Sequence, residues 1–386
     1  MKVVLIMDKF KESLSATEVA EAIFSGLSSK NGVSVCSIPL ADGGDGTIEA
    51  LDSMVGFEKV WIDTVDPLGR KITVPVLKGT RFICEMAQST ALVLLSEQER
   101  DPLRTSSYGF GSVIKTIAKM GAEEIIAGIG GSATNDCGAG MLQALGYRFY
   151  DRNGNIIRGA KQNGEEETEL LSDTLINGGD LADICKIDDA LVSKYVKSLK
   201  ITVASDVTNP LTGVYGATRV YGPQKGAGVD AVERLEAGVV NFAGVAEKFL
   251  GSDNSTLSGS GAAGGVGFAL NAFLRAELKP GWRVLFDMLD VEEKVRQADL
   301  IITGEGRVDG QSLSGKLLSG VSAICNKYKK RLWVICGDNL LTERELKRAG
   351  IERLYSVSQI EPMKELAIKN ARQYLYDIAR RLPITN

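Results

Sequence analysis

The sequence contains no histidine among its 386 residues. This absence excludes catalysis by Ser-His-Asp or Cys-His groups, zinc sites that depend on histidine, and a histidine general base. Any acid–base chemistry must therefore use Asp, Glu, Lys, Tyr or Cys side chains. Phosphoryl transfer is compatible with this restriction, because its transition state needs mainly positioning and neutralisation of charge.

Paired cysteines, excess basic charge and long apolar runs are also missing. The six cysteines form no C-x-x-C pair, which indicates neither a zinc site nor a disulfide framework. The net charge is −4 and the isoelectric point is near 5.3, which argues against a nucleic-acid-binding protein. No apolar run has the length of a membrane span, and the N-terminus lacks the apolar core of a signal peptide. We expect a cytoplasmic protein with no membrane or nucleic-acid partner.

Both ends of the chain alternate strands with helices. Residues 3–7 and 33–40 are strand-like, and between them Ser15 and Glu18 form a capping box for a helix that runs to about Leu27. The last third of the chain, from about Asp299, returns to this pattern. Such βαβα patterns are typical of a doubly wound parallel sheet, which binds ligands at the carboxyl ends of its strands.

The middle of the chain has a different pattern of apolar residues. Residues 61–65 and 71–76 alternate around an Asp-Pro-Leu-Gly turn and predict a β-hairpin. We therefore expect one α/β domain, residues 1–65 plus 286–386, interrupted by a second α/β domain over residues 66–285. Further predicted elements are strands 82–87, 124–129, 200–204, 299–303, 331–336 and 353–357, and helices 108–120, 139–145, 266–278, 314–328, 343–349 and 364–382.

Two glycine-rich loops carry acidic residues, and each follows an apolar strand-like run. They span residues 128–136 and 304–316. Glycine lets backbone N–H groups come close to an anion, and the N-terminus of a following helix adds partial positive charge. The neighbouring carboxylates would repel a bare phosphate but suit one that is bound with Mg²⁺. The combination indicates phosphoryl transfer.

Two further loops follow predicted strands and carry charged pairs. Asp42 and Asp45 lie on one Asp-Gly-Gly-Asp loop, for which a capped turn is the alternative explanation. Lys9 and Lys11 follow the first strand, where they could bind a carboxylate or a phosphate. A solvated loop is the alternative explanation for this pair. Residues 259–264 match G-x-G-x-x-G but follow no strand, so we reject a dinucleotide site there. Residues 310–316 are not a true P-loop, because a leucine follows the lysine.

These segments closely resemble the bacterial type I glycerate kinases, and the resemblance covers nearly the whole chain in order. The resemblance implies ATP-dependent phosphorylation of D-glycerate, commonly to 2-phosphoglycerate, with Mg²⁺. It also implies a flavodoxin-like α/β domain interrupted by a second α/β domain, with the active site in the cleft between them. The matching segments are residues 8–15, 39–47, 128–140, 222–227, 261–265 and 303–309.

The resemblance and the loops together give a hypothesis for the site. Without histidine, the base that activates the glycerate hydroxyl should be a carboxylate, and Asp45 is preferred. We expect the catalytic residues to be Asp45, Asp42, Lys316 and Lys9. We expect substrate contacts from Lys11, Arg70, Lys225 and Arg307. The nucleotide phosphates are assigned to Gly130, Gly131, Ser132, Gly304 and Gly306, and Mg²⁺ to Asp206, Asp136 and Glu305.

Other functions stay open at this point. The chain could be a kinase of a related small hydroxy acid, or a non-catalytic glycerate sensor on the same fold. A nicotinamide-dependent dehydrogenase is favoured only by residues 259–264 and is opposed by the absence of histidine. The sequence is compatible with a homodimer.

Overall fold

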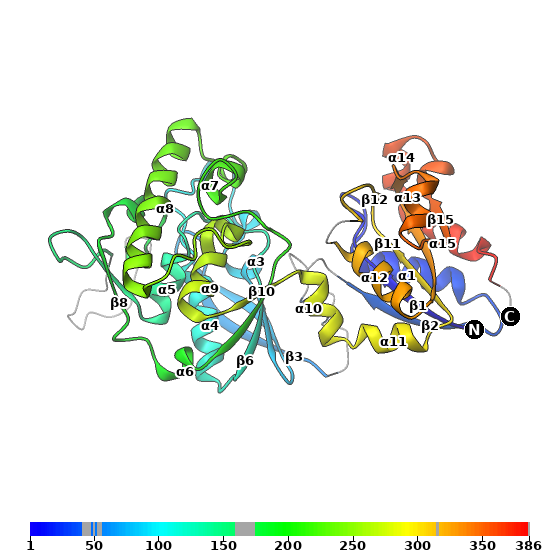
Figure 1. Cartoon of the computed structure of the whole chain (residues 1–386), viewed down its shortest axis with the longest axis horizontal. Coiled ribbons are helices and arrows are strands. Elements are labelled where there is room, and N and C mark those ends of the chain that lie inside the picture. Colours follow the sequence, from blue (N-terminus) through cyan, green and yellow to red (C-terminus); the bar gives the residue numbers. More distant parts are fainter. Residues whose placement is uncertain (41–47, 49–50, 52–55, 159–173, 314–315, 385–386) are drawn as a thin grey trace. The chain divides into compact units, whose positions relative to one another are not determined.

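The computed structural model describes residues 1–40, 48, 51, 56–158, 174–313 and 316–384 (Figure 1). The chain divides into two compact units. The first comprises Met1–Ala50 with Pro280–Asn386, and the second comprises Leu51–Lys279. Each unit is an α/β structure built on its own sheet with parallel strands.

The first unit is built on a five-stranded parallel sheet in the order β15-β13-β11-β1-β2. Its inner strands are almost entirely apolar and buried, as expected of a parallel sheet with both faces covered. The strands are β1 (Lys2–Met7), β2 (Ser34–Pro39), β11 (Leu300–Gly304), β13 (Arg331–Cys336) and β15 (Arg353–Ser356).

Helices pack against this sheet in the first unit (Figure 1). The predicted capping box of Ser15 and Glu18 is present at the start of α1 (Ala16–Leu27). This helix packs closely on α15 (Ala371–Arg381). Glycine at position 26 permits the approach, since a Cβ there would lie 2.6 Å from the Tyr376 carbonyl oxygen. Further helices of this unit are α10 (Gly281–Met288), α11 (Val291–Gln297), α12 (Leu317–Lys327), α13 (Glu343–Arg348) and α14 (Lys364–Lys369).

The second unit is built on a six-stranded sheet in the order β10-β9-β6-β5-β4-β3. The predicted hairpin is confirmed as the antiparallel pair β3–β4, and β4 is also antiparallel to β5. The remaining neighbours are parallel. The strands are β3 (Glu58–Val65), β4 (Lys71–Lys78), β5 (Phe82–Glu85), β6 (Glu124–Gly128), β9 (Lys200–Ala204) and β10 (Glu277–Lys279).

The core of the second unit lies between this sheet and its helices, where Phe110, Phe149, Phe242 and Phe268 are buried. A small hairpin of β7 (Arg148–Tyr150) and β8 (Lys186–Asp188) adds to the unit. The helices are α3 (Met86–Ser89), α4 (Tyr108–Lys119), α5 (Ala139–Leu145), α6 (Lys194–Lys197), α7 (Ala217–Tyr221), α8 (Val229–Leu250) and α9 (Val266–Leu274).

Several features differ from the sequence-based expectations, and the predicted strand 82–87 ends at Glu85, directly before α3 begins. The unit boundaries fall after residues 50 and 279 instead of 65 and 285, since β3 hydrogen-bonds with β4 in the second sheet. Helix α9 ends at Leu274, because Arg275 adopts a left-handed conformation (φ 56°) and residues 277–279 join the sheet as β10. The final helix is two helices separated at Asn370. The long helix α8 was not predicted.

Candidate functional site

The two glycine-rich loops lie at the carboxyl edges of the two sheets, one in each unit. In the first unit β1 and β11 are neighbours, with Met7 opposite Gly304. The Asp8 N–H donates to the Gly304 carbonyl oxygen at 3.0 Å, so the loops after these strands begin side by side. Gly304 can only be glycine here, because a Cβ would lie 1.7 Å from the Ile335 carbonyl oxygen.

Glu305 is the centre of a charged cluster in the first unit. Burial raises the pKa of this carboxyl group, and a hydrogen bond with the Ser312 side chain acts in the opposite direction. The positive charges of Lys316 and Lys11 also lower its pKa, whereas Asp309 raises it. The structure therefore brings three of the expected site residues, Lys11, Glu305 and Lys316, into one electrostatic environment.

The loop that carries Glu305 is fixed by its neighbours. The Gly306 carbonyl accepts a hydrogen bond from the Asp338 N–H at 3.0 Å, next to the short parallel pair β12 (Arg307–Val308) and β14 (Asp338–Asn339). Asp309 accepts hydrogen bonds from the N–H groups of Gln311 and Ser312 at 2.8 and 3.3 Å. Residues 304–313 of the predicted glycine-rich loop thus form a hydrogen-bonded platform beside the sheet edge.

Two exposed cations flank this platform. Lys316 immediately precedes α12, and its Nζ lies 3.4 Å from Gln311 Oε1. Arg307 lies on β12, with its Nε 4.0 Å from Asp338 Oδ2. Both can approach an anion, and the N-terminus of α12 would add to their effect.

The loop after β6 in the second unit is held by backbone hydrogen bonds. The Leu92 N–H donates to the Gly131 carbonyl at 2.9 Å, and the Ala133 N–H donates to the Thr90 carbonyl at 2.9 Å. Gly131 has a φ of 70°, a conformation that favours glycine. Gly130 and Ser132 are half-buried and Gly131 is exposed, so this part of the loop is accessible to a ligand.

Asp136, expected to bind metal, is fully buried and occupied by the protein itself. Its Oδ2 accepts hydrogen bonds from the Ser107 N–H at 2.8 Å, the Ser107 hydroxyl at 2.7 Å and the Gly140 N–H at 3.3 Å. Its Oδ1 accepts from the Gly138 N–H at 3.1 Å. Burial raises the pKa of Asp136, while these hydrogen bonds act to lower it. The geometry favours a structural role at the start of α5.

Lys225 and Arg70, both expected to contact substrate, are also engaged within the second unit. Lys225 is 2% exposed, and its Nζ donates to Ser132 Oγ at 2.9 Å and to the Thr134 carbonyl at 2.7 Å. The Arg70 guanidinium pairs with Asp66, and it also donates to Glu99 at 2.7 Å and to the Leu94 carbonyl at 3.1 Å. The Lys225 amine is therefore closed off from solvent, whereas the Arg70 side chain makes these contacts at an exposed position.

The remaining expected residues lie at strand ends or outside the described part. Lys9 follows β1 and is half-buried, and Asp206 follows β9 and is exposed. The predicted catalytic carboxylates Asp42 and Asp45 lie outside the described residues.

Sequence reasoning missed Glu85 as a candidate site residue. It ends β5 directly opposite Gly128 of β6, is 3% exposed, and accepts a hydrogen bond from Gln88 Nε2 at 3.1 Å. An acidic residue at the end of an apolar strand was the available signal. Glu85 therefore places a buried carboxylate beside the start of the glycine-rich loop.

A magnesium ion fits the first unit only in an arrangement shared with substrate. Within the described residues, no group of three or more carboxylate or cysteine side chains is placed to hold a metal. Mg²⁺ in kinases is usually held by one or two carboxylates together with substrate phosphates and water. Glu305 suits such a site, because it lies at a strand end among cations that would attract those phosphates.

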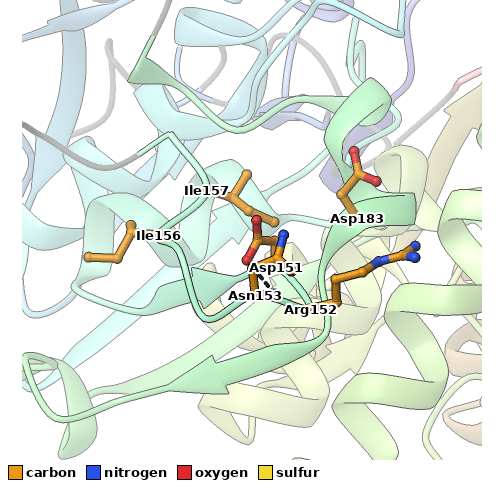
Figure 2. A pocket seen from close by; sticks show the side chains of 6 residues that line it. All are labelled: Asp151, Arg152, Asn153, Ile156, Ile157 and Asp183. Atoms are coloured by element: carbon orange, nitrogen blue, oxygen red, sulfur yellow. Dashed lines mark hydrogen bonds between the residues drawn. The ribbon is translucent and has the colours of Figure 1, made fainter.

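Two other features of the described residues lie apart from these loops. Figure 2 shows a surface hollow lined by Asp151, Arg152, Asn153, Ile156, Ile157 and Asp183, which contains none of the expected site residues. Across the residues for which the structure is described, no helix combines the length and apolarity needed to cross a membrane.

Comparison with known proteins identifies the family. The model of the glycerate kinase family matches residues 3–385. A glycerate kinase of Bacillus subtilis is 38% identical over 98% of this chain and 96% of its own length. A glycerate 2-kinase of Escherichia coli K12 is 42% identical over 92% of this chain and 90% of its own length.

A solved structure agrees with these relatives. The crystal structure of a Salmonella typhimurium LT2 protein assigned as glycerate kinase 2 superimposes with a TM-score of 0.81 at 38% identity, covering 99% of this chain and 98% of that one. The agreement of sequence and fold over almost the full length shows that the protein belongs to the glycerate kinase family and is an enzyme of that kind.

Proposed function

We propose that this glycerate kinase transfers the γ-phosphoryl group of ATP to D-glycerate and releases 2-phosphoglycerate. The observation that carries the proposal is that the loops after β1 and β11 meet at the carboxyl edge of a parallel sheet, where the charges of Lys11 and Lys316 act on Glu305. Kinase catalysis depends on positioning and charge neutralisation, which cations and a metal-binding carboxylate supply. The relative named glycerate 2-kinase supports the 2-phosphate as product.

In the first unit, Lys11 and Lys316 would neutralise phosphate charge, with Arg307 nearby on β12. Glu305 would hold Mg²⁺ together with phosphate oxygens of the nucleotide. Bound there, the ion would offset negative charge on the transferred group. The backbone of Gly304 and Gly306 would shape the floor of the site.

In the second unit, the accessible loop of Gly130, Gly131 and Ser132 would bind an anionic group through its backbone N–H groups. Asp206, at the end of β9, is proposed as a further oxygen ligand of Mg²⁺. Asp45 and Asp42 remain our proposed bases, and Lys9 a proposed catalytic cation.

We also infer that the first unit is flavodoxin-like. Its five parallel strands, numbered along the chain, run 2-1-3-4-5 across the sheet, which is the flavodoxin order. The inter-domain cleft, the cytoplasmic location and the homodimer stay predictions.

The test is ADP release from MgATP with D-glycerate, with L-glycerate as a stereochemical control and NMR identification of the product. We expect turnover with the D-isomer and a 2-phosphate product. Formation of 3-phosphoglycerate would refute the regiochemistry. Absence of turnover by the folded protein, with related hydroxy acids also inactive, would favour the glycerate-sensor alternative.

A further inference from the structure

Lys225 is a buried lysine that forms no ion pair with any of the residues that the structure describes. Lysine is almost never fully buried unless its charge is paired. The two hydrogen-bond partners of Lys225 Nζ, Ser132 Oγ and the Thr134 carbonyl, are both neutral. The Asp136 charge acts on it only at longer range. Stability of the fold alone would favour an apolar side chain at this position.

The backbone around Lys225 holds the side chain in place. Gly226 has a φ of 100°, and a Cβ there would lie 2.0 Å from the Arg100 carbonyl oxygen. A Cβ at Gly222 would lie 2.4 Å from the Thr218 carbonyl oxygen. Because the backbone is packed tightly on both sides of Lys225, the position of its amine is restricted.

That position is the base of the glycine-rich loop after β6. Lys225 contacts the loop at two points, Ser132 and Thr134, on either side of Ala133. Gly264 packs against the same Thr134 carbonyl, since a Cβ at Gly264 would lie 2.0 Å from that oxygen. Burial lowers the pKa of Lys225 to about 7, and a neutral amine has two N–H donors, the number that these contacts use.

We propose that Lys225 is a positioning residue of the kinase, whose amine holds Ser132 and Thr134 so that the loop of residues 128–132 keeps the conformation that binds an anionic group. It acts through the loop and not by touching the substrate. This inference rests on the proposed function for its catalytic consequence, but the contacts that carry it are independent of that function.

The experiment compares Lys225→Met, which keeps the apolar stem, with Lys248→Met, which replaces an exposed lysine on α8 of the same unit. The rate of hydrogen–deuterium exchange in a peptide spanning residues 128–136 measures the order of the loop. Steady-state kinetics measure kcat and KM. We expect faster exchange in this peptide and a kcat about 100-fold lower for Lys225→Met, with much smaller changes in KM. Lys248→Met should match the unmodified protein in both.

A double-mutant cycle tests the route of the effect. Ser132→Ala removes one of the two contacts, whereas Ser132→Thr retains the hydroxyl at this half-buried position. Lys225→Met with Ser132→Ala should be no worse than Lys225→Met alone, because the two residues act through one contact. Ser132→Thr should exchange more slowly in the 128–136 peptide than Ser132→Ala, because it keeps the hydroxyl that the Lys225 amine contacts.

Two outcomes would overturn the proposal. One is a raised KM for a substrate with unchanged loop exchange in Lys225→Met, which would mean direct substrate contact. The other is loop exchange that stays unchanged in both Lys225→Met and Ser132→Ala. If the unmodified protein does not phosphorylate D-glycerate, the proposed function fails, while the exchange experiment still decides whether Lys225 orders the loop.

Discussion

The stability of the second unit should depend on pH through Lys225. The folded protein lowers the pKa of this amine to about 7 from an ordinary value of 10.5, with burial as the main cause. Between these two values the unfolded chain binds more protons than the folded protein. The free energy of unfolding therefore rises with pH over this window, because deprotonation removes the cost of a buried charge.

The magnitude follows from the two pKa values. Each pH unit inside the window changes the free energy of unfolding by up to about 1.4 kcal/mol. Integration from pH 7 to pH 9 gives a gain of about 2 kcal/mol from this single group. Below pH 7 the gain fades, since the amine is then protonated in both states.

Urea unfolding at 25 °C of the unmodified protein and of Lys225→Met, at pH 7, 8 and 9, measures this term. Other titrating groups contribute to both proteins, so the difference between the two isolates the lysine. We expect the stability of the unmodified protein relative to Lys225→Met to increase with pH by about 2 kcal/mol. Lys248→Met, as the exposed control, should stay parallel to the unmodified protein.

A constant difference between the unmodified protein and Lys225→Met from pH 7 to pH 9 would refute the reasoning. It would mean that the amine stays protonated in the folded state across this range. The hydrogen bonds to Ser132 and Thr134 would then come from a buried ammonium group.

Three more predictions test the site and its scaffold. Asp136→Asn should lower the urea stability by about 2–4 kcal/mol, because an amide nitrogen cannot accept the bonds that the carboxylate receives; an unchanged midpoint would contradict the structural role. Gly304→Ala should cost about 3 kcal/mol or more, since its Cβ would meet the Ile335 carbonyl, and wild-type stability would argue against the packing of β11 on β13. Lys316→Ala should lower kcat about 100-fold in the ADP-release assay without loss of stability, whereas Lys364→Ala should have no effect; normal turnover by Lys316→Ala would remove this lysine from the site.

Much of the secondary structure could be predicted from the sequence, because residues close together in the chain determine it. The capping box of Ser15 and Glu18 sets the start of α1 with atoms only three residues apart. The hairpin β3–β4 was predicted from alternating apolar and polar residues and from a turn sequence between them, and the structure contains this antiparallel pair. The end of α9 was misjudged because the apolar pattern continues past Leu274, while the left-handed Arg275 turns the chain into a strand.

The candidate site was only partly readable. The glycine-rich loops could be predicted because they follow apolar strands. The grouping of Lys11, Glu305 and Lys316 agrees with the rule that ligands bind at the carboxyl ends of parallel strands. Asp136 and Arg70 were given ligand roles because an acidic or basic loop residue looks the same in sequence whether it binds a ligand or another part of the protein. The structure shows that these two side chains bond to Ser107 and Asp66, and their ligand roles stay predictions.

The sequence by itself determined the chemistry available to this protein: no histidine, loops that can approach phosphate, and an α/β pattern. The tertiary structure alone decided which distant segments meet. It places β1 beside β11, almost 300 residues away along the chain, and the Lys225 amine against Ser132 and Thr134. Burial is a property of the folded whole, so no local pattern around Lys225 distinguishes a solvated lysine from one whose pKa the interior lowers to about 7.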